Sequence, residues 1–383
     1  MLVAMVVFWG AWGLIVYTYA LYPLLLAVLG RLRSAETEAA PPDATSELPR
    51  VAMVVAAFNE ARILPRKLAN TWSIDYPADR FQLFVGSDGS PDASAEVLNA
   101  CEDPRLRAFC FAERRGKISV LNDLMAQVDA DIVVMSDANT MFEPRSVRRL
   151  VAHFADPKVG CVSGELLLEQ DGGVSGEGLY WRYEGFLKRQ ESRLGFLIGC
   201  NGGIFALRRG LYEPLPASTI VEDFVLSMRV LERGYQVKLE PEARATEPPC
   251  PTARAEMTRK VRIGAGNFQA LGLTRNLLHP RYGLPCLGFW SHKVLRWMVP
   301  QLVLVGLVAN LFLVRTPAYS AILAAQLLGL AVAAWASHKP EGQRPPRWTR
   351  PISYFYLMNY ALLCGFFRYL FRTQRVTWDR AAR

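Results

Sequence analysis

The feature that most restricts the fold is an uncharged segment, Leu2–Gly30, which is rich in Leu, Val, Tyr and Trp. It is long enough to cross the hydrocarbon core of a bilayer, which requires about 20 apolar residues. Arg31 and Arg33 follow it directly, and basic residues accumulate on the cytoplasmic side of membranes. The sequence therefore predicts a membrane helix over residues 1–33, then a polar linker over residues 34–49 that leads into the cytoplasm.

Three more apolar segments lie beyond residue 276. Met298–Val314 and Tyr319–Ser337 are strong predicted spans, whereas Ile352–Phe371 is weaker because it contains Asn359 and Arg368. If all three segments cross the membrane, the basic tail 372–383 lies outside the cytoplasm, against the charge rule. Either the third segment is interfacial or re-entrant, or the tail breaks the rule. We expect interface and transmembrane helices over residues 276–371.

The middle region, residues 50–275, alternates short β-branched runs with helix-like stretches, which predicts a largely parallel, doubly wound α/β sheet. Ligands of such sheets bind beyond the carboxyl ends of the strands. A later amphipathic segment, 179–194, is either a helix in the membrane interface or a surface helix packed on the sheet. The expected strands are 51–58, 81–87, 105–111 and 132–135, and the expected helices are 60–72, 94–101, 117–128 and 144–154.

The net charge of +9 suits anionic partners such as nucleotide phosphates or a membrane surface. The basic residues form no long tract, and the chain has no zinc-finger, helix-turn-helix or RNA-binding pattern, so we expect no nucleic-acid partner. The cysteines number seven and lack metal-ligand spacing. They are expected to be buried free thiols in a reducing compartment.

Polar residues follow the first two expected strands. Glu60, after Phe58 and Asn59, either binds a ribose hydroxyl or base N–H group, or belongs to an ordinary helix N-terminal turn. Asp88 lies between two glycines and is either a ligand at a strand end or part of a simple Asp-Gly turn. Lys117 opens a helix after two arginines and a glycine, a pattern that suits phosphate.

The fourth expected strand leads into Asp137-Ala138-Asn139, whose two oxygen-bearing side chains can share a divalent cation and a diphosphate. A common strand-end turn is the alternative, and the neutral Asn139 would hold a metal more weakly than a carboxylate. Further on, Asn201-Gly202-Gly203 allows the close approach of a polyhydroxylated acceptor.

Two charged motifs follow in the second half of the middle region. Glu222 and Asp223 open an apolar helix, where Asp223 is either a helix cap or a general base for an alcohol. Arg259, Lys260 and Arg262 either neutralise a diphosphate leaving group or are cations beside the membrane whose stems lie along apolar surface. Each motif is weak alone, but their order and their positions after strands strengthen the set.

With these motifs in this order, residues 49–267 resemble the processive-type family 2 glycosyltransferases, which include cellulose, hyaluronan, chitin and poly-N-acetylglucosamine synthases. The resemblance implies a GT-A fold, a nucleotide-sugar-binding αβα sandwich joined to interface and transmembrane helices. It implies that Glu60 and Asp88, with Phe58 and Lys117, bind the nucleotide. Asp137 and Asn139 correspond to the family's Asp-x-Asp motif for diphosphate and Mg²⁺ or Mn²⁺, with Asn139 in place of the second acid.

The resemblance also assigns the acceptor side. Asn201, Gly202 and Gly203 correspond to the acceptor-binding turn, and Glu222-Asp223 to the Glu-Asp pair in which Asp223 is the catalytic base. Arg259-Lys260-Val261-Arg262-Ile263 aligns with the family's Gln-x-x-Arg-Trp motif. Arg262 is kept, whereas Ile263 replaces the Trp that stacks on the acceptor sugar in relatives, so the processivity and the acceptor are less certain than the transfer itself.

The expected function is inverting transfer of a hexose or N-acetylhexosamine from a UDP-sugar to a growing polysaccharide. The expected location is the cytoplasmic membrane, with several membrane passes and the catalytic domain on the cytoplasmic face. Transfer to a lipid acceptor, which gives a glycolipid, is the alternative within the enzyme class. A catalytically inactive sugar-binding or scaffold subunit is the alternative from another class, and membrane lipids are expected partners in each case.

Overall fold

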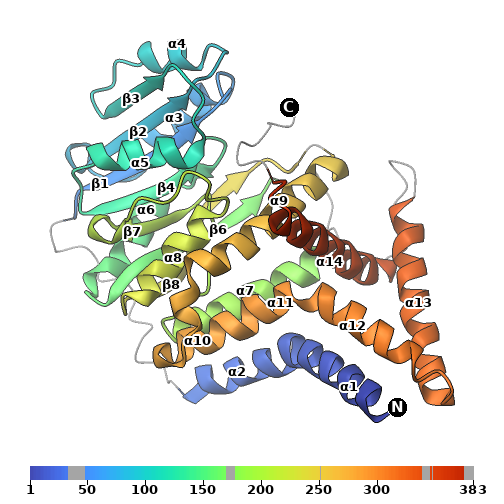
Figure 1. Ribbon diagram of the computed structural model, residues 1–383. Helices are drawn as coiled ribbons and strands as arrows, with labels where there is room; N and C mark the ends of the chain where they lie inside the picture. The colour runs from blue at the N-terminus through green and yellow to red at the C-terminus, as the bar shows by residue number, and fades with distance from the viewer. Residues whose placement is uncertain (33–47, 170–176, 251, 339–345, 347, 375–383) are drawn as a thin grey trace.

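The computed structural model describes residues 1–32, 48–169, 177–250, 252–338, 346 and 348–374. A sheet with helices on both faces forms one part of the molecule, and long helices form a platform beside it (Figure 1). The expected linker 34–49 and the expected tail 372–383 fall largely outside the described residues.

The sheet has eight strands in the order β3-β2-β1-β4-β7-β6-β8-β5. Strands β1 to β4 are mutually parallel neighbours, as the sequence predicts, and they carry the first half of the predicted site. The second half is mixed, because β7 runs antiparallel to both β4 and β6. The strands are β1 Val51–Ala57, β2 Phe81–Asp88, β3 Leu106–Phe111, β4 Ile132–Asp137, β5 Met141–Phe142, β6 Val159–Leu168, β7 Phe205–Arg208 and β8 Gln236–Glu247.

Helices cover both faces of this sheet and make a three-layer αβα arrangement. One apolar cluster joins the sheet to the helices α5 (Lys117–Gln127) and α8 (Glu222–Glu232). A second cluster joins the opposite face to α3 (Leu64–Trp72), α4 (Ser94–Asn99) and α6 (Ser146–Ala152). The four helices predicted for the first half are confirmed, with ends shifted by up to four residues. Short 3-10 turns connect these elements at Ala78–Arg80, His153–Ala155 and Arg209–Leu211.

The N-terminal segment forms one long helix, α1 (Leu2–Val16), a π-helical turn η1 (Tyr17–Leu21) and α2 (Tyr22–Leu32). Among the described residues, this helix and residues 317–336 of α13 (Pro317–Ser337) are long and apolar enough to cross a membrane. A third candidate is a pair of consecutive helical segments, 284–297 and 299–311, with a bend of 59° between their axes. By themselves, the 13 residues of α12 (Val299–Leu311) reach only about 20 Å, so the span expected over 298–314 requires its neighbour.

The last apolar segment forms α14 (Thr349–Leu370), which is not among the helices that are long and apolar enough to be candidate spans. It packs along α9 (Ala253–Leu273), and the two helices lie side by side in Figure 1. Two glycines allow this contact, because a Cβ atom at Gly365 would lie 2.6 Å from the Ala265 nitrogen and 2.8 Å from the Gly264 Cα atom. Short 3-10 turns, Arg275–Leu278 and Pro280–Tyr282, follow α9.

The amphipathic segment predicted over 179–194 is the helix α7 (Glu177–Arg193), which contacts both β8 and α2. It therefore lies between the sheet and the N-terminal helix, which is a candidate membrane span. Buried polar contacts fasten it there, since the Glu191 carboxylate accepts a 2.9 Å hydrogen bond from the Tyr22 hydroxyl and contacts His292 Nδ1 at 2.6 Å. His292 belongs to a second π-helical turn, η7 (Phe289–Val294), between α10 (Leu284–Gly288) and α11 (Leu295–Trp297).

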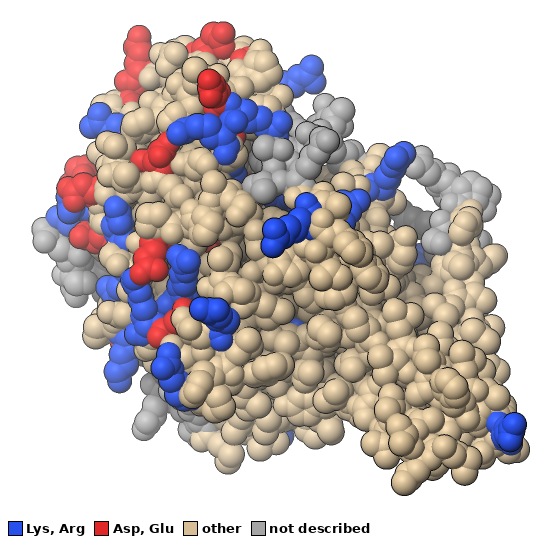
Figure 2. All heavy atoms as spheres, viewed as in Figure 1, with Lys and Arg blue, Asp and Glu red and all other residues tan. Residues whose placement is uncertain are grey.

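Charged side chains gather over the sheet and its helices, whereas the surface formed by α1, α12 and α13 is almost free of them (Figure 2). Large apolar side chains such as Trp9, Leu328 and Trp335 are exposed on these helices. An exposed apolar surface of this extent is typical of a membrane-embedded region.

All seven cysteines are free, but only Cys161, Cys200 and Cys286 are buried. Cys110 is exposed, so the expectation that all of them are buried is wrong for this residue. It lies on β3 at the edge of the sheet, where alternate side chains face solvent.

Candidate active site

The predicted site residues come together at the carboxyl ends of the parallel strands. The strand register explains this, because Ala57 pairs with Ser87 and Ala56 pairs with Asp137. Residues that directly follow β1, β2 and β4 therefore lie at one edge of the sheet. The N-termini of α5 and α8 reach the same edge, since Lys117 contacts both Asp137 and Glu222.

The loop after β1 places Glu60 in a buried position, with 4% of its surface exposed. Asn59 adopts a left-handed conformation (φ 56°), which an Asn tolerates better than most residues. Hydroxyl groups of the neighbouring loop hold this turn, because the Asn59 and Glu60 amides donate to Ser90 Oγ at 3.1 Å and Ser94 Oγ at 3.0 Å. The turn and its carboxylate are thus fixed before any ligand binds.

Asp88, at the end of β2, is also buried, and both of its carboxylate oxygens accept backbone hydrogen bonds. The donors are the amides of Arg115 at 2.7 Å and Gly116 at 2.8 Å. Gly89 (φ 59°) must be glycine, since a Cβ atom there would lie 2.5 Å from the Arg114 nitrogen. Asp88 therefore holds the turn that precedes α5, and its predicted contact with a nucleotide stays a prediction.

Phe58 and Arg114 form a cation–π pair in the loops that carry or contact these carboxylates. The guanidinium carbon of Arg114 lies 3.8 Å from the centroid of the Phe58 ring, within the range of a cation–π contact. Both side chains are at least partly exposed, so the pair offers a surface on which a planar base could stack. Phe58 was predicted from the sequence as a nucleotide-binding residue, whereas Arg114 was noted only as part of a phosphate-type motif.

Lys117 links the two acidic motifs. Its ammonium lies 2.6 Å from Asp137 Oδ1 and 2.5 Å from Glu222 Oε1. These two carboxylates raise the pKa of Lys117 against the opposing effect of burial, so it stays charged. The lysine thus joins the end of β4 to the start of α8 across the middle of the site.

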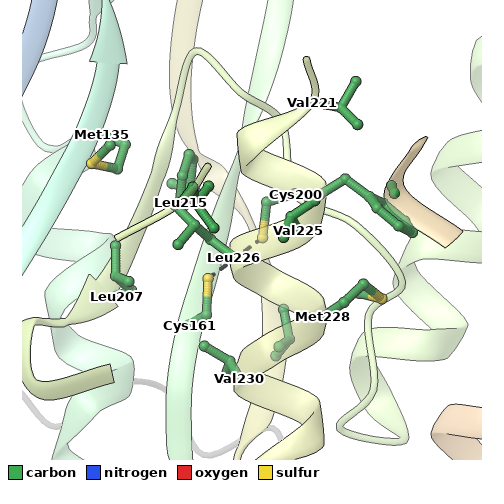
Figure 3. Close-up of a cluster of buried hydrophobic side chains, with 14 of the residues drawn as sticks. Met135, Cys161, Cys200, Leu207, Leu215, Val221, Val225, Leu226, Met228 and Val230 are labelled. Atoms are coloured by element: carbon green, nitrogen blue, oxygen red, sulfur yellow. Dashed lines mark hydrogen bonds between the residues drawn. The ribbon is translucent and has the colours of Figure 1, made fainter. Parts of the chain in front are cut away.

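Asp223 follows Glu222 at the N-terminus of α8. Burial, together with the nearby Glu222 carboxylate, raises the pKa of Asp223 to about 7. Val225, Met228 and other apolar side chains anchor α8 against the sheet (Figure 3). This packing fixes the start of the helix and with it the position of the Asp223 carboxylate.

The turn Asn201-Gly202-Gly203 passes directly beside Asp223. A Cβ atom at Gly202 would lie 3.0 Å from Asp223 Oδ2, and one at Gly203 would lie 2.8 Å from Thr140 Oγ1. Asn201 holds the turn, because its amide group donates to the Gly164 carbonyl at 2.6 Å and accepts from Lys188 Nζ at 2.6 Å. Glycine at these positions therefore allows the turn to approach the carboxylate closely.

The predicted basic set on α9 divides into two groups. The charge of Arg262 interacts with Glu222, Asp137 and Asp223, and its buried Nε atom lacks a hydrogen-bond partner. Arg259 and Lys260 instead pair with Glu256, at 2.9 Å and 3.4 Å. The structure therefore brings Arg262 into the site, and a role for Arg259 and Lys260 toward a diphosphate stays a prediction.

Lys67 is a buried residue that supports the loop carrying Asp137 and Asn139. It was not identified from the sequence. Its buried ammonium donates to Ser136 Oγ at 2.8 Å and to the Thr140 carbonyl at 2.6 Å, on the two sides of Asp137 and Asn139. Burial lowers the pKa of Lys67 to about 7, although the charge of Asp137 opposes this effect. A lysine among Leu64, Leu68 and Thr71, at the spacing of the apolar face of a helix, was the available signal.

Comparisons with known proteins relate this chain to glycosyltransferases. Residues 52–215 match the model of glycosyl transferase family 2. The chain is 26% identical over 276 residues to the beta-monoglucosyldiacylglycerol synthase of Synechocystis sp., which covers 68% of this chain and 57% of the relative. It is 26% identical over 207 residues to the poly-beta-1,6-N-acetyl-D-glucosamine synthase of Staphylococcus aureus, which covers 51% of this chain and 49% of the relative.

A solved structure supports the fold over nearly the whole chain. A mannosyltransferase from Pyrobaculum calidifontis, in complex with GDP-Man and Mn²⁺, superimposes with a TM-score of 0.72 at 21% identity. The superposition covers 97% of this chain and 99% of the other. The architecture of strands, flanking helices and platform is thus shared, so the chain has the GT-A fold, and residues 52–215 within it match the family 2 glycosyltransferase model.

Proposed function

We propose that the protein transfers a sugar from a nucleoside-diphosphate donor to a hydroxyl of a membrane-associated acceptor, with inversion at the anomeric carbon. The observation that carries this proposal is the position of Asp223. It is a carboxylate of raised pKa, beside a glycine turn and next to the cationic groups of Lys117 and Arg262. This arrangement supports a role for Asp223 as the base for the acceptor, beside positive charge for the leaving group.

The reaction balances with groups of this chain. The acceptor hydroxyl gives its proton to Asp223, and its oxygen forms a bond to the anomeric carbon from the face opposite the nucleotide. The bond between that carbon and the diphosphate oxygen breaks, and the electron pair leaves with the diphosphate. Arg262 and Lys117 stabilise the developing negative charge, which is the type of contribution that dominates many transfer reactions.

A divalent cation fits the residues present, although the protein alone would hold it weakly. Within the described ranges there is no cluster of three or more His, Cys, Asp or Glu residues that could bind a metal. Asp137 and Asn139 can provide two oxygen ligands, and Mg²⁺ or Mn²⁺ commonly binds through one or two protein groups and substrate phosphates. The cation would neutralise diphosphate charge. The similar mannosyltransferase structure contains Mn²⁺, which supports this assignment.

The donor site is proposed to include Glu60, Asp88 and the pair formed by Phe58 and Arg114. Uridine is the expected base, while the mannosyltransferase of similar fold was solved with GDP-Man. The chain spans about half the length of the curated relatives, so their own donors are not transferred to it. A screen with both uridine and guanosine donors is therefore required.

The acceptor has two candidates, each supported by one relative. The similarity to a beta-monoglucosyldiacylglycerol synthase supports a lipid, and the similarity to a poly-beta-1,6-N-acetyl-D-glucosamine synthase supports a growing polysaccharide. Ile263 favours the lipid, because it packs on the apolar core where the synthases that this chain resembles carry a sugar-stacking Trp. We therefore place the lipid first and the polysaccharide, which was the expectation from sequence, second.

The exposed apolar helices support a location in the membrane, and the basic residues Arg31 and Arg33 support a cytoplasmic position for the domain. The rival interpretation, an inactive scaffold subunit, predicts sugar binding without turnover. It is disfavoured by the combination of Asp137, Asp223 and Lys117 in one network.

The test is a screen of UDP- and GDP-sugars with the purified protein, Mg²⁺ or Mn²⁺ and membrane lipids, with the released nucleotide and product mass as readouts. We expect nucleotide release with one donor class and a single lipid-extractable product. A series of products of increasing mass would instead identify a growing polysaccharide as the acceptor. Donor binding without any nucleotide release would overturn the proposal in favour of the scaffold.

A further inference from the structure

The segment Gly199–Gly203, which includes the turn beside Asp223, contacts two lysines from the helical platform. Lys188 of α7 donates to Asn201 Oδ1 at 2.6 Å. Lys293 of η7 lies at Gly199, where its Cε atom would be 4.0 Å from an added Cβ atom, and the same Cβ would be 3.0 Å from Phe224, the neighbour of Asp223. Gly199 and Gly202 are at most about 11 Å apart along the chain. The two ammonium groups and the base thus border one small region.

The nearby carboxylates are already engaged by other groups. Glu184 pairs with Arg296 and His292, while Glu191 contacts Tyr22, His292 and the Ile198 amide. Within the described part of the chain, the structure shows no hydrogen bond or ion pair to the Lys293 ammonium. Within the same described residues, the Lys188 ammonium is hydrogen-bonded only to the neutral side-chain amide of Asn201.

The charged groups that act on Lys293 are two cations, Lys188 and Arg296, and two carboxylates, Glu184 and Glu191. Together with Lys293 itself, these five groups carry more positive than negative charge. Like charges in a partly buried region are unfavourable unless an anion joins them. An arrangement of this kind is typical of a site that receives an anionic group.

The surroundings indicate where that anion comes from. Lys293 lies in the segment that leads into the apolar helix α12. In the same turn, the Ser291 hydroxyl shares a 2.8 Å hydrogen bond with the hydroxyl of Tyr17 in the N-terminal candidate membrane helix. Lys188 lies on α7, which packs on α2 of the same membrane helix. A molecule that reaches the two lysines thus arrives beside helices whose exposed surface is apolar.

We infer that Lys188 and Lys293 bind the phosphate of an anionic lipid headgroup, and that a hydroxyl of the same headgroup is the acceptor presented to Asp223. This inference rests on the proposed function and makes it narrower, because it excludes uncharged diacylglycerol as the preferred acceptor. The transfer step is unchanged: the headgroup hydroxyl loses its proton to Asp223 and gains the sugar, and the nucleoside diphosphate departs.

The test uses the full chain in vesicles of phosphatidylcholine and phosphatidylserine, which keep the surface negative without offering a headgroup hydroxyl. Either phosphatidylglycerol or diacylglycerol is added, together with labelled donor from the screen above. We expect label in phosphatidylglycerol. Lys293→Met should raise the apparent KM for this lipid on the order of tenfold, as expected for loss of one charged hydrogen bond, and Lys293→Arg should restore it.

The matched control is Arg281→Met, which removes one positive charge from an exposed residue that stacks on its own neighbour, Tyr282. It should leave the KM for lipid unchanged, and donor hydrolysis without acceptor should be equal in all variants. Equal or better labelling of diacylglycerol, a normal KM in Lys293→Met, or label confined to an acidic polysaccharide would each overturn the inference while nucleotide release persists. Absence of nucleotide release with every donor would overturn the proposed function as well.

Discussion

Asp223 shows how the fold changes the chemistry of a single side chain. In water an aspartate is ionised above pH 4, and it is then a weak base. Burial and the neighbouring Glu222 raise its pKa to about 7, so the carboxylate form and its basicity are both available near neutral pH. The helix start that carries it is fixed by the apolar contacts of α8.

We expect kcat/KM for transfer to rise with pH through about 7 and then to level off, because the base must be deprotonated. Asp223→Asn should lower kcat by about 10²–10⁴-fold and remove this pH dependence. A pH–rate profile of both proteins is the measurement. A profile of the wild type that is flat between about pH 6 and 8 would contradict the role of Asp223 as base.

The same shift makes a prediction for stability. Because the pKa of Asp223 is higher in the folded than in the unfolded chain, ionisation of this group lowers the free energy of unfolding. This loss is absent below about pH 4 and reaches its full size above about pH 7. Asp223→Asn should therefore melt at a higher temperature than the wild type at pH 8, with the difference shrinking as the pH falls. Asp129→Asn is the control, because Asp129 is exposed and its contact with Arg50 lowers its pKa, the opposite of the shift at Asp223.

Lys67 is expected to position the loop that holds Asp137 and Asn139. Lys67→Met removes two hydrogen bonds from an ammonium, to Ser136 and Thr140, and should raise the apparent KM for Mn²⁺ and donor by about tenfold or more. We expect little loss of folding stability, since burying the ammonium is itself costly. Metal titrations of donor hydrolysis measure the effect, and a change in kcat alone would argue against positioning.

At the scale of elements, α9, the helix that carries Arg262, packs against α14. The helices meet at Gly264 and Gly365, and the backbone of α9 occupies the space that a side chain at Gly365 would need. α14 therefore supports the catalytic domain instead of lying apart from it as an independent span.

Gly365→Ala should destabilise the protein by about 1–3 kcal/mol, as overpacking typically does, and should reduce transfer by displacing Arg262. The control is Gly272→Ala on α9, where no atom lies within 4 Å of the added methyl group. That variant should be neutral or more stable by up to about 1 kcal/mol. Thermal unfolding and activity of the two variants are the measurements, and equal melting temperatures would refute the close contact.

At the scale of the whole molecule, polar and apolar surfaces are separated between the sheet domain and the helical platform (Figure 2). We expect the protein to stay with vesicles in high salt and at alkaline pH and to be released by detergent only, because burial of apolar helices is insensitive to ionic screening. Vesicle flotation is the measurement. Release by salt alone would show that the net charge of +9 accounts for the attachment.

Much of the fold and site followed from local patterns. The strands β1 to β4 and the motifs at their ends were predictable, because β-branched runs and strand-end acids are short-range signals and parallel strands place their ends at one edge. The strands β6 to β8 were not predicted, since their pairing depends on distant partners and the sheet there is mixed. The role of Lys67 was missed for the same reason, because its partners Ser136 and Thr140 lie about 70 residues away along the chain.

The sequence by itself determined that an α/β domain of nucleotide-binding type joins apolar helices, because periodicity and residue type express the need to bury apolar surface. Only the tertiary structure decided how the charges combine. In the folded chain, Lys117 pairs with Asp137 and Glu222. Arg262 interacts with the acidic residues of the site, whereas Arg259 pairs with Glu256. The helix α14 packs against α9. The physical reason is that a charge interacts with whatever the folded chain brings within a few ångströms, and sequence separation does not encode that distance.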